Sequence, residues 1–177
     1  MKRLLIVIDM QEDFVYGALR NEEAIKIVNN VKNKIISYQN SNDTVIFTKD
    51  THFNETYDKS LEGIKLPVKH CIKGTVGHDL VKELKEFEKD GSLVIEKLTF
   101  GYTEWKKIFD DKKISFDEIE LVGVCTDICV LSNAIILRAF YPNSIIKVDS
   151  NCCAGLSPQK HENALDVMES CQIDVIR

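Results

Sequence analysis

Short runs of apolar, β-branched residues alternate with longer segments of helical periodicity along this chain, and that alternation most constrains its fold. Six runs predict strands, at residues 4–8, 44–48, 93–95, 119–124, 145–148 and 173–176. They do not alternate apolar with polar residues, which is typical of strands buried on both faces of a parallel sheet.

The intervening segments predict helices at residues 21–38, 77–89, 103–109, 127–140 and 157–170. Strands that alternate with helices indicate a parallel sheet with right-handed crossovers and helices on both of its faces. Residues 50–76 interrupt this alternation of strands and helices, because they show no clear helix or strand. An irregular loop of that length inside a domain is usually functional.

Length and charge restrict the class of protein. The 177 residues suit one domain, 1–177, with a large core. With 28 acidic against 23 basic residues, a surface for nucleic acid is not expected. The first apolar run ends at Asp9, too short for a signal peptide, and no run approaches the ~18 residues of a membrane helix. We expect a cytoplasmic protein with no membrane partner, whose six cysteines are free thiols.

Polar or reactive residues follow five of the predicted strands. Open parallel sheets bind ligands beyond the carboxyl ends of their strands, so these positions are the first candidates for a site. They are Asp9, then Asp50 with His52, then Lys97, then residues 125–129 and residues 151–153.

Cys129 is the candidate nucleophile at this edge. It lies where a buried strand turns into a helix, and Thr126 or Asp127 can cap that helix. A thiol in the first helical turn has its thiolate favoured by the backbone N–H groups and the helix dipole. The alternative is a buried cysteine that fills a gap in the core.

Asp9 and Lys97 complete a candidate triad with Cys129. A carboxylate that ends an apolar strand is partly desolvated, which raises its pKa toward a value useful for taking a proton from a thiol. Lys97 can lower the pKa of the thiol and orient the carboxylate. Alternatively, Asp9 is a helix cap and Lys97 an exposed lysine.

Asp50, His52, Glu62 and His70 form a candidate metal site in the long loop. Two imidazoles and two carboxylates suit a divalent ion such as zinc, iron or manganese. Glu55 and Asp58 lie in the same loop, so the identity of the third ligand stays open. The alternative is a pair of surface histidines.

Thiol–disulfide chemistry is a weaker alternative. Cys125 and Cys129 are four residues apart, not three as in thioredoxin-like proteins, and Cys152 is adjacent to Cys153, which gives poor disulfide geometry. His78 and His161 fall in predicted helices and are interpreted as surface or packing residues.

Five segments occur in order along the chain: 9–14, 48–52, 67–71, 97–101 and 123–130. Together they resemble the isochorismatase-like cysteine hydrolases, in particular the nicotinamidase/pyrazinamidase branch. The resemblance implies a three-layer α/β/α fold with a six-stranded parallel sheet. It also implies a catalytic triad of Asp9, Lys97 and Cys129, an oxyanion hole from the backbone N–H groups of Cys125 and Cys129, and a cis peptide before Cys125.

For function, the resemblance implies hydrolysis of nicotinamide to nicotinate and ammonia through a thioester, in a homo-oligomer. The implied metal, zinc first, would anchor the substrate through Asp50, His52, Glu62 and His70. Implied substrate contacts are Phe14, Leu66, Phe100 and Tyr102, where Leu66 replaces a ring-stacking tryptophan. Open alternatives are a related hydrolase of carbamoyl, ureido or maleamate-type amides, a non-catalytic subunit and a redox thiol protein.

Overall fold

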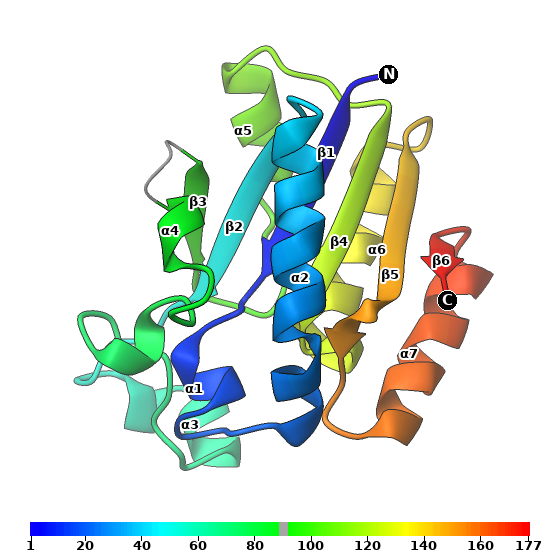
Figure 1. Cartoon of the computed structure of the whole chain (residues 1–177). Coiled ribbons are helices and arrows are strands. Elements are labelled where there is room, and N and C mark those ends of the chain that lie inside the picture. Colours follow the sequence, from blue (N-terminus) through cyan, green and yellow to red (C-terminus); the bar gives the residue numbers. More distant parts are fainter. Residues whose placement is uncertain (89–91) are drawn as a thin grey trace.

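Six parallel strands form one sheet in the order β3-β2-β1-β4-β5-β6 (Figure 1). The structure, a computed structural model, describes residues 1–88 and 92–177. The strands are β1 (Arg3–Ile8), β2 (Thr44–Asp50), β3 (Leu93–Lys97), β4 (Glu118–Val124), β5 (Ile145–Ala154) and β6 (Asp174–Ile176). All six predicted strands are confirmed, most of them one or more residues longer than their apolar runs.

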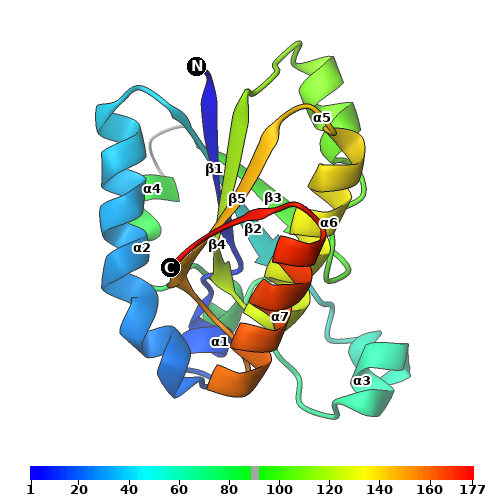
Figure 2. The same ribbon diagram turned by 90° about the vertical axis from the view of Figure 1, so that its right-hand side faces the viewer.

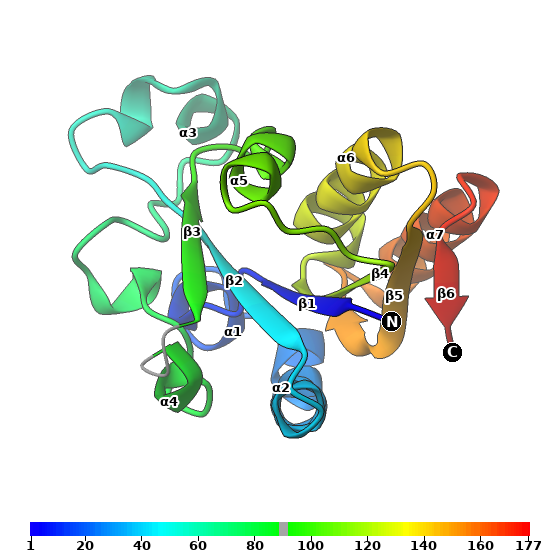
Figure 3. The ribbon, with the colours of Figure 1, turned by 90° about the horizontal axis from the view of Figure 1, so that it is seen from above.

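Helices cover both faces of the sheet. Seen from above, α2 and α4 lie on one face, and α5, α6 and α7 lie on the other (Figure 3). The helices are α1 (Glu12–Val15), α2 (Glu22–Asn40), α3 (Leu61–Lys65), α4 (Lys85–Glu88), α5 (Trp105–Asp111), α6 (Leu131–Phe140) and α7 (Pro158–Ser170). The short 3-10 turns η1 (Tyr57–Lys59) and η2 (Val76–His78) and the π turn η3 (Thr126–Val130) complete the set. The predicted three-layer α/β/α architecture is therefore confirmed.

Two apolar cores fill the space between the layers. Under α2, Val28, Val31 and Ile35 pack on one face of the sheet. On the other face, Trp105 of α5 and Leu137 of α6 join the apolar side of α7. Because β1 contributes to both cores, its residues 4–8 are apolar at successive positions; in β4 this holds from Leu121 to Val124, whereas Glu118 and Glu120 alternate with apolar residues before it.

The predicted helix at 77–89 is largely wrong. Helix α4 covers only Lys85–Glu88, and residue 89 lies outside the described residues. Just before it, the backbone runs antiparallel to the segment after β1, where Val81 N–H donates to Met10 O (2.9 Å) and Glu12 N–H donates to Asp79 O (2.9 Å). These groups bond to a distant segment in place of their own helix, so tertiary contacts override the local pattern.

The long loop after β2 is ordered by its own turns. It contains η1 and then α3, which Ser60 caps by accepting a hydrogen bond from Gly63 N–H. An isolated parallel bridge pairs His52 with Ile72 and so closes the loop on itself. Figure 2 shows α3 standing apart from the layers, beyond the ends of the strands.

All six cysteines are free thiols, as expected, and only Cys171 is exposed. Within residues 1–88 and 92–177, no helix combines the length and the apolar character needed to cross a membrane.

A buried charge cluster fixes α2 on the sheet. Lys34 Nζ lies 2.7 Å from Glu120 Oε1 on β4 and 2.7 Å from Asp149 Oδ2 on β5. Tyr38 OH donates to the other oxygen of Glu120 at 2.6 Å. Burial alone would lower the pKa of Lys34, but the two carboxylates outweigh it and raise that pKa. One ammonium therefore bridges two largely buried carboxylates.

Replacing Lys34 should destabilise the fold. Lys34→Ala leaves Glu120 and Asp149 without their cation, so we expect a loss of about 3 kcal/mol in the free energy of unfolding. Lys26 on the same helix is 66% exposed and pairs with the partly exposed Glu23, so Lys26→Ala should change that free energy by less than about 0.5 kcal/mol. Urea unfolding measures both, and equal losses in the two variants would contradict the role of Lys34.

Candidate active site

The carboxyl ends of four neighbouring strands bring the predicted residues together. Strands β3, β2, β1 and β4 are adjacent and parallel, so Lys97, Asp50, Asp9 and the turn after β4 meet at one end of the sheet, the lower end in Figure 1. Gly123 permits the close approach of β4 to β1, since an added Cβ would lie 2.1 Å from Ile8 O, and its φ is 115°.

Lys97 is the centre of the first cluster. Its Nζ lies 2.6 Å from Asp9 Oδ2 and 3.7 Å from Cys129 Sγ. Thr48 Oγ1 donates to the other oxygen of Asp9 at 2.6 Å. Asp9, Lys97 and Cys129 are at most 4% exposed. The three residues predicted as a triad are thus assembled in a water-poor environment, and Lys97 touches both of the others.

Burial controls the protonation of this cluster. It raises the pKa of Asp9, although the Lys97 cation works in the opposite direction. It raises the pKa of Cys129 well above the ordinary thiol value, again against the effect of Lys97. The expectation that the helix start favours the thiolate is therefore wrong, because desolvation is the larger effect. The thiol needs a neighbouring base.

The turn that carries Cys129 differs from a capped helix. Residues 126–130 form a π turn, and no side chain caps it or α6. Thr126 Oγ1 instead bonds to His161 Nδ1 (2.8 Å), and Asp127 Oδ1 accepts from Leu156 N–H (3.0 Å). The predicted caps are therefore wrong, since both side chains bind the segment after β5. The peptide bond between Val124 and Cys125 is cis, as the resemblance implied.

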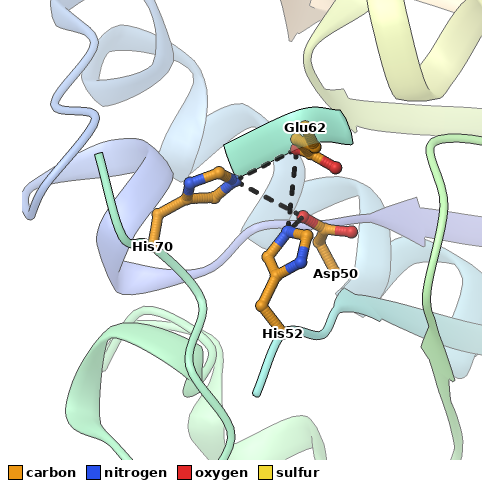
Figure 4. A group of neighbouring side chains, drawn as sticks. All are labelled: Asp50, His52, Glu62 and His70. Carbon is orange, nitrogen blue, oxygen red and sulfur yellow. Dashed lines mark hydrogen bonds and ion pairs between the residues drawn. The ribbon is translucent and has the colours of Figure 1, made fainter. Parts of the chain in front are cut away.

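Asp50, His52, Glu62 and His70 converge in a second cluster (Figure 4). Their nearest donor atoms all lie within 4.8 Å of one another. His52 Nε2 is 2.9 Å from Asp50 Oδ2 and 3.7 Å from Glu62 Oε1. His70 Nε2 is 3.7 Å from that Asp50 oxygen and 3.5 Å from that Glu62 oxygen.

These separations fit a metal ion. Ligand atoms around tetrahedral zinc, each about 2.1 Å from the ion, lie roughly 3.4 Å apart. The loop carboxylate in the cluster is Glu62, whereas Asp58 pairs with Lys69 Nζ (2.9 Å) and its side chain is 68% exposed. Glu55 is also exposed. The fold therefore selects Glu62 among the candidates for the third ligand.

The electrostatics of the cluster favour a cation. Burial raises the pKa of Asp50, but hydrogen bonds from His52 and His70 outweigh it and hold that pKa well below its usual range. Burial lowers the pKa of His70, but hydrogen bonds to Asp50 and Glu62 outweigh it and raise the value to about 10. Two carboxylates thus attract positive charge to the point between the imidazoles, where a divalent ion would supply it.

Two supporting residues were not predicted from the sequence. Tyr57 is buried with its OH 3.2 Å from His70 Nδ1, and His70 Nδ1 also lies 2.9 Å from Val68 O. These contacts fix the ring and direct Nε2 into the cluster. The Gln11 side chain makes two hydrogen bonds to the backbone of Asp50, accepting from its N–H (2.8 Å) and donating to its C=O (2.9 Å). The only signal for Gln11 was its place just after β1.

The two clusters touch. Lys97 Nζ lies 3.4 Å from Asp50 Oδ1, so one ammonium contacts the triad carboxylate, the thiol and a residue of the metal cluster. Asp50 and Lys97 are direct partners in the register of β2 and β3, which explains this contact.

The four predicted substrate contacts lie in different settings. The Phe14 ring is 5.5 Å from the His70 ring, beside the metal cluster. Leu66 is partly exposed, and its carbonyl accepts from Tyr57 OH (2.7 Å). Phe100 is 45% exposed, whereas Tyr102 packs edge-on against Trp105. Phe14 thus lies beside the second cluster, the Phe100 ring is open to solvent, and Tyr102 packs against Trp105.

Known proteins share both the sequence pattern and the fold. Residues 3–177 match the family model of the isochorismatase domain. A nicotinamidase from Schizosaccharomyces pombe is 27% identical over 97% of this chain and 91% of its own. A crystal structure of a nicotinamidase/pyrazinamidase from Bacillus subtilis has a TM-score of 0.84, with 29% identity and full coverage of both chains.

A second crystal structure bears on the metal cluster. The pyrazinamidase of Pyrococcus horikoshii, solved in complex with zinc, has a TM-score of 0.83 and 26% identity, covering 100% of this chain and 99% of its own. Since the family model matches nearly every residue, the chain belongs to the isochorismatase family.

Proposed function

We propose that this chain is a metal-containing cysteine amidohydrolase that converts nicotinamide and water to nicotinate and ammonia. The observation that carries the proposal is the joint placement of the two clusters. Lys97 Nζ contacts Asp9, Cys129 and Asp50, so a candidate nucleophile and a candidate metal site lie on either side of one side chain. The nicotinamidase relatives support the choice of substrate.

In the first half of the reaction, the amide becomes a thioester. Asp9 takes the thiol proton of Cys129, and the sulfur attacks the carbonyl carbon. The backbone N–H groups of Cys125 and Cys129 stabilise the negative charge on the oxygen, at about 2.7–4 kcal/mol per donor. The C–N bond then breaks, and ammonia leaves with the proton that Asp9 returns.

In the second half, water releases the acid. Asp9 takes a proton from a water molecule, which attacks the thioester carbonyl, and the C–S bond breaks. The sulfur regains its proton from Asp9, and nicotinate leaves. Lys97 stays protonated throughout, because Asp9, Cys129 and Asp50 together outweigh the effect of burial and hold its pKa above the usual range.

The metal cluster would anchor the substrate. A divalent ion there, zinc by the choice of ligands, would hold the pyridine nitrogen directly or through water. Asp50, His52, Glu62 and His70 supply the ligands, and Phe14 beside His70 offers a face for the ring. Aromatic amides with a ring nitrogen should then be preferred over small aliphatic amides.

The triad is tested by removing its reactive groups. Cys129→Ala should lower the rate of ammonia release from nicotinamide by at least about 10⁴-fold, since no other group can form the thioester. Asp9→Asn should lower it by at least about 100-fold, because the isosteric amide accepts no proton. The measurement is a coupled ammonia assay with nicotinamide, pyrazinamide and a panel of carbamoyl and ureido amides.

Cys153→Ala is the matched control, because Cys153 is also a buried thiol in the same core cluster as Cys129. It should retain activity within a few-fold of the native chain. Ammonia release from nicotinamide that persists in Cys129→Ala would overturn the mechanism. Release from the carbamoyl or ureido amides alone would replace the substrate while keeping the reaction class.

The metal site is tested by counting bound metal. His70→Ala and Glu62→Ala each remove one ligand, so the affinity for zinc should fall by more than the roughly 10- to 100-fold that losing a supporting contact causes. Asp58→Ala should retain native stoichiometry, because Asp58 lies in the same loop but pairs with Lys69. Elemental analysis after dialysis measures this, and metal retained by Glu62→Ala but lost by Asp58→Ala would refute the assignment.

A further inference from the structure

Asn133 is a fully buried polar side chain outside both clusters. It lies on the first turn of α6, four residues after Cys129, and has no exposed surface. Its Nδ2 donates to Cys129 O (2.8 Å) and to Phe100 O (3.1 Å). Its Oδ1 accepts from Tyr102 N–H (2.9 Å) and from Trp105 Nε1–H (2.9 Å). Two donors and two acceptor sites are thus all used.

These four bonds connect the nucleophile to a single neighbouring segment. Three of the partners belong to the chain between β3 and the start of α5, and the fourth is the backbone carbonyl of Cys129 itself. The segment begins at Lys97, whose Nζ donates to Thr99 O (3.3 Å). The segment is therefore linked to the proposed catalytic cluster twice, to Lys97 directly and to Cys129 through Asn133.

The segment depends on its backbone contacts for its position. Phe100 is 45% exposed, so burial of its ring does not hold the loop in place. Gly101 lies against α6, where an added Cβ would come within 2.6 Å of Ile136 Cδ1 and 3.2 Å of Ser132 Cβ. Asn133 bonds the residues on either side of this glycine, Phe100 through its C=O and Tyr102 through its N–H.

We propose that Asn133 is a positioning residue that sets the distance between the Cys129 nucleophile and the Phe100 wall of the substrate pocket. The inference rests on the proposed function, and it adds that the exposed Phe100 ring contacts the substrate. Asparagine suits this task since it offers donors to two carbonyls and acceptors to two N–H groups from one rigid plane. An apolar residue of similar size would remove the partner of all four groups, two of them in fully buried contacts.

The expected signature is a loss of substrate binding that exceeds the loss of turnover. Asn133→Ala frees the loop, so KM for nicotinamide should rise at least about tenfold, because Phe100 is no longer held in a fixed position against the substrate; tenfold corresponds to about 1.4 kcal/mol of binding free energy. The fall in kcat should be smaller than the rise in KM. Val31→Ala creates a cavity in the core on the other face of the sheet, which contains no residue of this loop, and should leave KM unchanged.

A spectroscopic signal follows the same contact. Trp105 is the only tryptophan of the chain, it is buried, and Asn133 accepts its Nε1–H. Asn133→Ala should shift the emission of Trp105, whereas Val31→Ala, in the core on the other face of the sheet, should not. If Asn133→Ala does not fold, Gly101→Ala tests the same loop, because its added methyl group pushes the loop away from α6 and should also raise KM.

The outcomes separate this inference from the proposed function. If the native chain hydrolyses nicotinamide and both Asn133→Ala and Gly101→Ala keep the native KM, the inference is overturned and the function stands. If the native chain cleaves only another amide of the panel, the same comparison is made with the KM for that amide, and a native KM in both variants overturns the inference. A native chain that releases ammonia from no amide overturns both.

Discussion

The Lys97 ammonium is the charge on which the site depends. It is 1% exposed, and a bare cation at that depth would be strongly unfavourable. It persists because Asp9 lies at 2.6 Å and Asp50 at 3.4 Å, so each carboxylate compensates the cation and is compensated by it. The thiol of Cys129 completes the shell at 3.7 Å. The proposed catalytic and metal clusters are therefore one electrostatic unit, in which a change of charge in one cluster alters the other.

The sheet topology produces this unit. A parallel sheet places the carboxyl ends of all its strands on one edge, and the order β3-β2-β1-β4 makes the four strands that carry the site consecutive neighbours. The strand register then sets which residues are neighbours: Asp50 is paired directly with Lys97, and Ile8 with Gly123. The turns of the chain after those pairs carry Asp9 and Cys129 into the same space. The candidate metal ligands of the long loop lie close to this edge because the backbone of His52 pairs with that of Ile72, which folds the loop back on itself.

The parts of this arrangement that follow from burial were predictable, and those that follow from specific contacts were not. Strands buried on both faces leave continuous apolar runs, so all six strands and the polar residues at their ends could be identified. The helix at 77–89 failed because backbone groups such as Val81 N–H bond to the segment after β1. Glu62 could not be chosen over Asp58, since only the folded loop separates them. Asn133 carries no signal, because nothing in a helical pattern shows which bonds a buried amide makes.

The depth of the site also explains why a lysine, rather than a neutral donor, stands between acid and thiol. Burial raises the pKa of both Asp9 and Cys129, so a second negative charge on Cys129 beside the Asp9 carboxylate is disfavoured. When a proton moves from the Cys129 thiol to Asp9, the negative charge moves from the Asp9 carboxylate to the Cys129 sulfur. Because the ammonium touches both positions, its attraction is retained throughout the transfer. A buried cation thus lowers the cost of forming a thiolate that the protein interior would otherwise suppress.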